Sequence, residues 1–155
     1  MKLEEFVDAN LVGDINSKKR TTGFVFTLGG TAISWGLNLQ KVVAFSITEV
    51  EYIALIEGVK EMIWLQTFMK ELGQKCDMRT LYSDSQNDIF LVKNLAFHSK
   101  TKHIQLKYFF IRHLFSDEQL KLEEICGSQN PVDMLTKSVT VEKLRLYTTS
   151  IGLLA

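Results

Sequence analysis

The chain has 155 residues, of which 46% are hydrophobic and 23% are charged. This length and composition are typical of one globular domain and exclude disordered, collagen-like and coiled-coil chains. The two cysteines, Cys76 and Cys126, lie 50 positions apart in the sequence, which excludes a disulfide framework or a cysteine-rich zinc site. Both thiols are expected to be buried as small hydrophobic side chains. No apolar run approaches the roughly 18 residues of a membrane span, so no membrane partner is expected.

The charges are balanced in number but not in position. Lys and Arg total 18 and Asp and Glu total 18, yet residues 89–116 contain no acidic side chain and hold all three histidines. This stretch, the basic strip, is expected to contact a polyanionic partner. A solvated helix face is the alternative interpretation of such a run.

The first part of the chain predicts three strands and a long helix. Residues 3–8 predict a short strand, and 22–28 and 31–35 predict a hairpin because β-branched and aromatic residues flank the turn pair Gly29-Gly30. Residues 48–72 predict a helix that is apolar on nearly every side, so we expect it to be buried.

The rest of the chain alternates strands and helices. Its predicted elements are strands at 78–83 and 120–126, helices at 85–94 and 101–115, and a final helix that Asn130-Pro131 opens. An antiparallel start followed by strand–helix alternation predicts an α/β fold, with a five-stranded mixed sheet flanked by helices.

Four carboxylates stand where predicted strands end or predicted helices begin: Asp8, Glu49, Asp84 and Asp133. Strand ends and helix starts gather along one rim of such a sheet, where α/β folds bind ligands. Acids on one rim repel each other unless cations neutralise them, and oxygen ligands suit divalent magnesium.

Each of these acids also has a purely structural interpretation. Ser46 with Glu49, and Thr48 with Glu51, have the spacing of a capping box, and Asn130 with Asp133 has the same spacing. The remaining two acids suit a turn and a strand end. Position alone leaves the two interpretations open.

Motifs along the whole chain resemble one family. They are Val7-Asp8-Ala9-Asn10, Thr22-Gly23-Phe24, Ser34-Trp35, Thr48-Glu49-Val50-Glu51-Tyr52, Tyr82-Ser83-Asp84-Ser85-Gln86, Thr101-Lys102-His103-Ile104 and Asn130-Pro131-Val132-Asp133-Met134-Leu135-Thr136-Lys137. In this order and spacing, the chain resembles the ribonuclease H domain of plant copia-type LTR retrotransposon Pol polyproteins.

The resemblance implies one ribonuclease H-like domain over 1–155, as a fragment of a longer polyprotein with its reverse transcriptase domain upstream. It implies a metal-dependent endonuclease that hydrolyses the RNA strand of RNA–DNA hybrids during reverse transcription. The expected location is inside the cell, in the cytoplasm, a virus-like particle or the nucleus.

The family's catalytic, metal-binding acids carry over onto Asp8, Glu49, Asp84 and Asp133. By this resemblance they hold two Mg²⁺ ions, with Mn²⁺ as a substitute. Glu51 lies about 200° from Glu49 around the helix and is the weaker candidate.

A hybrid duplex presents two phosphate backbones, so its affinity is expected to come from basic side chains. The expected nucleic-acid-binding residues are Lys18, Lys19, Arg20, Lys93, Lys100, Lys102, His103, Lys107 and Arg112. The aromatic residues interleaved with them recur at helical spacing and are expected in the core. They are Phe97, Tyr108, Phe109, Phe110 and Phe115.

The chain also departs from the family pattern. Asn10-Leu11 stands where members commonly have Asp-Trp, and residues 124–129 contain no histidine of the kind that helps product leave in some ribonucleases H. Two alternatives follow: a catalytically inactive, eroded or domesticated nucleic-acid-binding module of the same fold, and a fragment that acts only as an interaction or scaffold domain. Cleavage of a hybrid excludes the first, and hybrid binding at low salt excludes the second.

Overall fold

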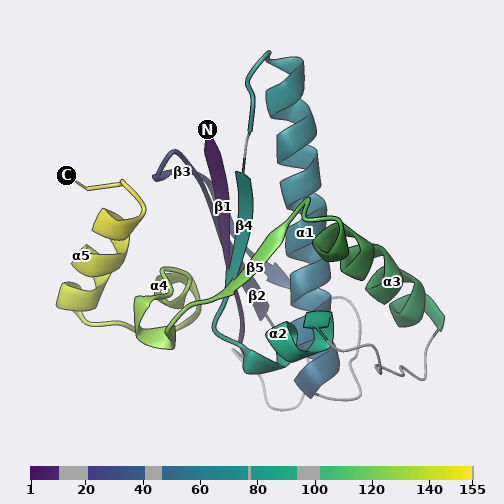
Figure 1. Cartoon of the computed structure of the whole chain (residues 1–155). Coiled ribbons are helices and arrows are strands. Elements are labelled where there is room, and N and C mark those ends of the chain that lie inside the picture. The colour runs from purple at the N-terminus through teal and green to yellow at the C-terminus, as the bar shows by residue number, and fades with distance from the viewer. Residues whose placement is uncertain (11–20, 41–46, 77, 94–101, 155) are drawn as a thin grey trace.

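Five strands form one mixed sheet with helices on both of its faces (Figure 1). The computed structural model describes residues 1–10, 21–40, 47–76, 78–93 and 102–154, and the elements given below lie within them. The side chains at 10, 47–50, 78, 87, 88, 91 and 102–105 also lie outside the described part. Within it, no helix combines the length and apolarity needed to cross a bilayer. The predicted α/β fold with a five-stranded mixed sheet is confirmed.

The sheet has the strand order β3-β2-β1-β4-β5. Its strands are β1 (Lys2–Asn10), β2 (Thr21–Leu28), β3 (Thr31–Leu39), β4 (Met78–Ser83) and β5 (Lys121–Glu124). The first three are antiparallel neighbours, whereas β4 runs parallel to β1 and β5 runs parallel to β4. Gly29 and Gly30 form the hairpin turn with φ angles of 59° and 83°, which glycine adopts at no steric cost. Because β1 and β4 are parallel neighbours, their carboxyl ends lie side by side.

α1 (Ile47–Glu71) packs along one face of the sheet and supplies much of the main core. Tyr52, Leu55 and Met62 are buried in it. Trp64 and Phe68, however, are 57% and 44% exposed. Leu65 and Met69 in the same half of α1 are 7% and 8% exposed, so Trp64 and Phe68 lie four positions apart on an outward face of the helix. The expectation of a helix buried on every side is therefore wrong for this face.

α2 (Gln86–Lys93) and α3 (Lys102–Ser116) pack beside α1. Tyr108 lies in the core and Phe115 packs against it, as expected. Phe109 and Phe110 are 63% and 52% exposed, so the core interpretation is wrong for them. Helical geometry explains the split, because neighbouring positions in a helix are 100° apart and cannot all face the core. Phe97 lies outside the described residues.

The segment after β5 holds two helices where one was predicted. A short 3-10 turn, η1 (Gly127–Gln129), leads to α4 (Asp133–Thr136), and α5 (Val141–Ser150) follows. The backbone of Lys137 is extended, and the Thr140 side chain caps α5 by accepting a hydrogen bond from the Lys143 N–H at 3.3 Å. This cap starts a new helix, so the predicted single helix is interrupted.

α4 and α5 cover the face of the sheet opposite α1 (Figure 1). Val132 and Ile151 form a second, smaller apolar cluster with Val25 of β2. A Cβ atom at Gly23 would lie 2.6 Å from Cγ1 of Val132 and 2.9 Å from Cγ2 of Thr136. Glycine at this position therefore allows α4 to approach β2 closely.

Candidate functional site

Asp8 and Asp84 stand at the carboxyl ends of two adjacent parallel strands. Val7 of β1 pairs with Ser83 of β4, so an aspartate follows the paired residue on each strand. The structure thus brings together two of the acids that the sequence predicted to converge.

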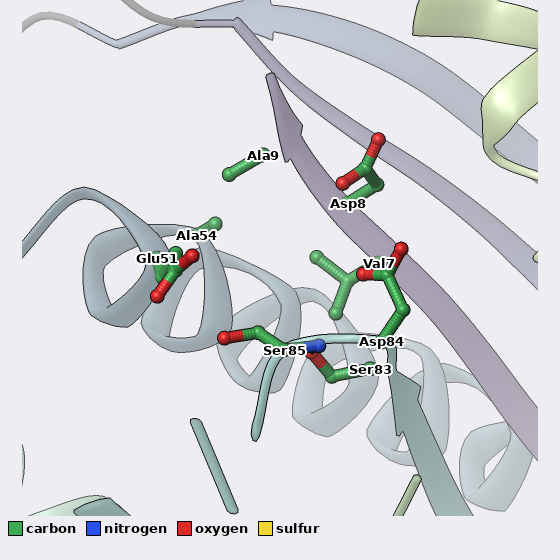
Figure 2. Close-up of a pocket in the computed structure, with 8 residues that line it drawn as sticks. All are labelled: Val7, Asp8, Ala9, Glu51, Ala54, Ser83, Asp84 and Ser85. Atoms are coloured by element: carbon green, nitrogen blue, oxygen red, sulfur yellow. The ribbon is translucent and has the colours of Figure 1, made fainter. Parts of the chain in front are cut away.

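A pocket of about 230 Å³ opens beside these two aspartates. Its lining consists of Val7, Asp8, Ala9, Glu51, Ala54, Ser83, Asp84 and Ser85 (Figure 2). Figure 2 shows Asp8 and Asp84 on the strand side and Glu51 on the α1 side. Three carboxylates from three separate segments therefore line one pocket.

Glu49, the predicted helix ligand, lies in the first turn of α1, and its side chain is outside the described part. The spacing from Ser46 to Glu49 is that of a capping box, so capping stays the alternative role of Glu49. Glu51, which the sequence made the weaker candidate, lines the pocket.

Asp133 enters the site from α4, on the opposite face of the sheet from α1. The Lys137 ammonium lies 2.8 Å from Oδ1 of Asp133 and 3.5 Å from Oδ2 of Asp8. The Thr136 hydroxyl donates a hydrogen bond to the same Oδ2 at 3.1 Å. Gly23 is the β2 partner of Asp8, so the space that lets α4 approach lies directly beside this acid. Lys137 and Thr136 therefore join the two acids, a role that sequence reasoning missed.

The buried side chain of Asn130 ties the backbones of both acids together. Its amide nitrogen donates to the Val7 carbonyl at 3.2 Å, and its Oδ1 accepts from the Val132 N–H at 3.2 Å. These two residues directly precede Asp8 and Asp133. Asn130 was predicted as the helix cap, but Val132 holds the N-cap position of α4, so Asn130 closes the preceding turn instead.

Burial and nearby charge shift two pKa values in the site. The pKa of Asp84 is raised, first by burial and next by the negative charge of Asp8, while the positive charge of Lys137 opposes the shift. Burial alone would lower the pKa of Lys137, but its hydrogen bond to Asp133 and the charge of Asp8 raise it. The mutual repulsion expected of acids on one rim therefore contributes to the raised pKa of Asp84, although burial is the larger cause.

The donor set fits hard divalent cations. Asp8, Asp84, Asp133 and Glu51 offer only oxygen atoms, which magnesium prefers, and like charge already acts between three of them. Among the described residues, no three His, Cys, Asp or Glu side chains stand close enough to chelate one ion. Cation binding at these acids would therefore draw the carboxylates closer together.

The predicted basic residues are only partly described. Lys18, Lys19, Arg20 and Lys100 lie outside the described residues, as do the side chains of Lys102 and His103. Lys93 and Lys107 are exposed. Lys93 and Arg112 line a groove of about 580 Å³ between α2, α3 and β5, together with Lys121. The structure thus gathers part of the basic strip on the α2–α3 side of the sheet.

Cys126 is exposed, contrary to expectation, because it lies in the turn after β5, while Cys76 is half-buried. A hydrogen bond shared with the Ser128 hydroxyl at 3.1 Å lowers the pKa of the Cys126 thiol. The next residue is Gly127, where an added Cβ would lie 3.3 Å from Oδ2 of Asp84. The turn after β5 therefore borders the acidic site.

Two curated relatives match nearly the whole chain. It is 47% identical over 151 residues to the Retrovirus-related Pol polyprotein from transposon TNT 1-94 of Nicotiana tabacum, covering 97% of this chain and 11% of the relative. It is 31% identical over 155 residues to the Retrovirus-related Pol polyprotein from transposon RE2 of Arabidopsis thaliana, covering 99% of this chain and 11% of the relative. The chain thus spans about a tenth of the length of these relatives. No family profile matches it.

Solved structures share the fold at low sequence identity. LC11-RNase H1, crystallised in complex with an RNA/DNA hybrid, matches with a TM-score of 0.61 and 18% identity, covering 86% of this chain and 93% of that one. The N-terminal RNase H domain of Rv2228c from Mycobacterium tuberculosis matches with a TM-score of 0.60 and 15% identity, covering 97% and 99%. At these identities the likeness shows the fold alone.

Proposed function

Because the chain is homologous to Pol polyproteins of plant transposons and has the ribonuclease H fold, we propose that it cleaves the RNA strand of RNA–DNA hybrids during reverse transcription. The observation that carries this proposal is the convergence of Asp8, Asp84 and Asp133 at one end of the sheet, with Glu51 lining the same pocket as the first two. The RNA/DNA hybrid bound by LC11-RNase H1 supports the choice of substrate.

The same four acids are the residues that would hold two divalent cations, Mg²⁺ with Mn²⁺ as a substitute. We place Glu51 in this set because it lines the pocket. Glu49, whose side chain lies outside the described part, is the alternative helix ligand. When bound, such cations activate water and stabilise the leaving oxygen of a phosphodiester. The chain's own residues orient the acids: the Thr136 hydroxyl donates to the Asp8 carboxylate, and the Asn130 amide donates to the carbonyl of the preceding residue, Val7.

The basic strip is proposed as the surface that binds the hybrid backbone. Lys93 and Arg112 share one groove and Lys107 is exposed on α3, so their charges are available to phosphates. In this proposal the reverse transcriptase domain precedes the chain in the same polyprotein. The reaction then takes place inside the cell, in the cytoplasm, a virus-like particle or the nucleus.

Cleavage of a labelled RNA–DNA hybrid, with and without Mg²⁺, tests the proposal directly. RNA–RNA and DNA–DNA duplexes are the substrate controls. Asp84→Asn should reduce cleavage by orders of magnitude while hybrid binding stays close to that of the parent chain. Cleavage by Asp84→Asn at the parental rate would refute the assignment of these acids, and binding without cleavage by the parent chain would support the inactive module.

Glu51→Gln and Glu49→Gln form a matched pair for the helix acid. We expect Glu51→Gln to lose cleavage with an unchanged melting temperature. Glu49→Gln should keep cleavage and lose at most about 1 kcal/mol of stability, because it weakens only a helix cap. The reverse pattern would restore Glu49 as the helix ligand.

A further inference from the structure

Lys137, the residue directly after α4, contacts two acids of the site, and its spacing from Asp133 explains only one of these contacts. It stands four residues after Asp133, and such a pair on an exposed helix contributes little to stability. The same ammonium also approaches Asp8, which lies on the first strand of the chain. The side chains of Asp8 and Asp133 are only 9% and 13% exposed, so water solvates their charges poorly and a nearby cation has a strong effect.

The two carboxylates that face Lys137 are among those that would hold a divalent cation. Oδ1 of Asp133 accepts from the ammonium at 2.8 Å, and Oδ2 of Asp8 lies 3.5 Å from it. Carboxylate oxygens bind Mg²⁺ at about 2.0–2.1 Å, so a cation held by these two acids would lie close to the ammonium and repel it. This arrangement agrees with the finding that no three acids among the described residues stand ready to chelate an ion.

We propose that Lys137 is an internal counter-cation of the site, which holds Asp8 and Asp133 together in the cation-free protein and is displaced when a divalent cation binds them. Lys137 is thus a positioning residue that acts through the two carboxylates. This inference rests on the proposed function, because it needs the acids to bind a divalent cation.

Calorimetric titration with Mg²⁺ of the parent chain, Lys137→Met and Lys143→Met tests the proposal. Lys143→Met is the matched control, since it removes the same charge from an exposed position on α5. Lys137→Met should melt at a lower temperature without Mg²⁺, because Asp8 and Asp133 then repel each other. It should also bind Mg²⁺ more tightly, on the order of tenfold, because no ammonium competes for the oxygens. The control should match the parent chain in both respects.

A second measurement does not depend on the folding of a variant. Reductive ¹³C-methylation of lysines keeps their charge and gives each one an NMR signal. On addition of Mg²⁺ to the parent chain, the Lys137 signal should move as the ammonium leaves the carboxylates, while the Lys143 signal should stay in place.

The possible outcomes separate this inference from the proposed function. Absence of Mg²⁺ binding by the parent chain would refute the cation site itself, and this inference with it. If the parent chain binds Mg²⁺ but Lys137→Met binds it equally or more weakly, only the counter-cation role is overturned. A Lys137 signal that does not respond to saturating Mg²⁺ would overturn it as well.

Discussion

Glu5 is a buried acid whose ionisation should control the stability of the core. It lies on β1 between Leu3 and Val7, is fully buried, and among the described residues neither of its carboxylate oxygens has a hydrogen-bond partner. Gly58 of α1 provides the room, since a Cβ there would collide with Oε1 of Glu5. Burial, reinforced by the negative charge of Glu61, holds the pKa of Glu5 well above its ordinary value.

The direction of the pH dependence follows from this raised pKa. Below the pKa of an unfolded glutamate, about 4.3, Glu5 is protonated in both states and its stability contribution is fully present. Above that pH the unfolded chain releases the proton while the folded chain keeps it. The folded state then loses about 1.4 kcal/mol per pH unit until the pH reaches the folded-state pKa. For a domain of this size, the loss lowers the melting temperature by roughly 3–6 °C per pH unit.

Glu5→Gln removes this ionisation with little change of shape. In urea unfolding at increasing pH, we expect the stability advantage of Glu5→Gln over the parent chain to grow with the slope given above, from about pH 4 until Glu5 ionises in the folded state. Glu123→Gln, exposed on β5, controls for the change in net charge. A difference that stays flat with pH would refute the reasoning, because Glu5 would then ionise equally in both states.

Three further predictions concern close packing and charge. Gly58→Ala should lower the stability of the parent chain more than it lowers the stability of a chain that already carries Glu5→Ala. We expect a coupling energy of about 0.5–3 kcal/mol in this double-mutant cycle, and additive effects would contradict the contact between the two residues. Gly23→Ala should push α4 off β2 and speed amide hydrogen exchange in α4, and unchanged protection there would argue against this packing. Lys93→Ala with Lys107→Ala should flatten the slope of log hybrid affinity against log salt by up to about 1.8 in fluorescence anisotropy. As a control, replacing two exposed lysines of α1, Lys60 and Lys70, by alanine should leave this slope unchanged.

Elements with a local cause were predictable from the sequence. β4 was predicted to the residue, and the hairpin follows from Gly29-Gly30 between β-branched runs. The break in the last predicted helix was missed although its cause is local, because the Thr140 cap of α5 lacks a Glu or Gln three residues later. The contact of Lys137 with Asp8 of β1 could not be predicted from a local pattern, because the two residues lie far apart in the chain.

The acidic site was predictable as a group of acids but not as a set of contacts. Glu49 and Glu51 both have the spacing of a capping box, so the sequence did not separate them. The packing of α1 against the sheet does place Glu51 in the pocket beside Asp8 and Asp84, and Glu49 lies about 200° away around the helix. The role of Thr136 was beyond sequence reasoning, because it needs α4 to approach the strand beside Asp8.

The route by which Asp8 meets Asp133 has a consequence for the order of assembly. The Thr136 hydroxyl that holds Asp8 lies 128 positions further along the chain, so this contact can form only after that much more of the chain has been synthesised. α4 is docked through a cluster with three buried residues, whereas the main core has fourteen among the described residues. Local opening should therefore release α4 while the sheet stays folded. The lifetime of the assembled site is then the time that α4 stays docked, which is shorter than the lifetime of the sheet.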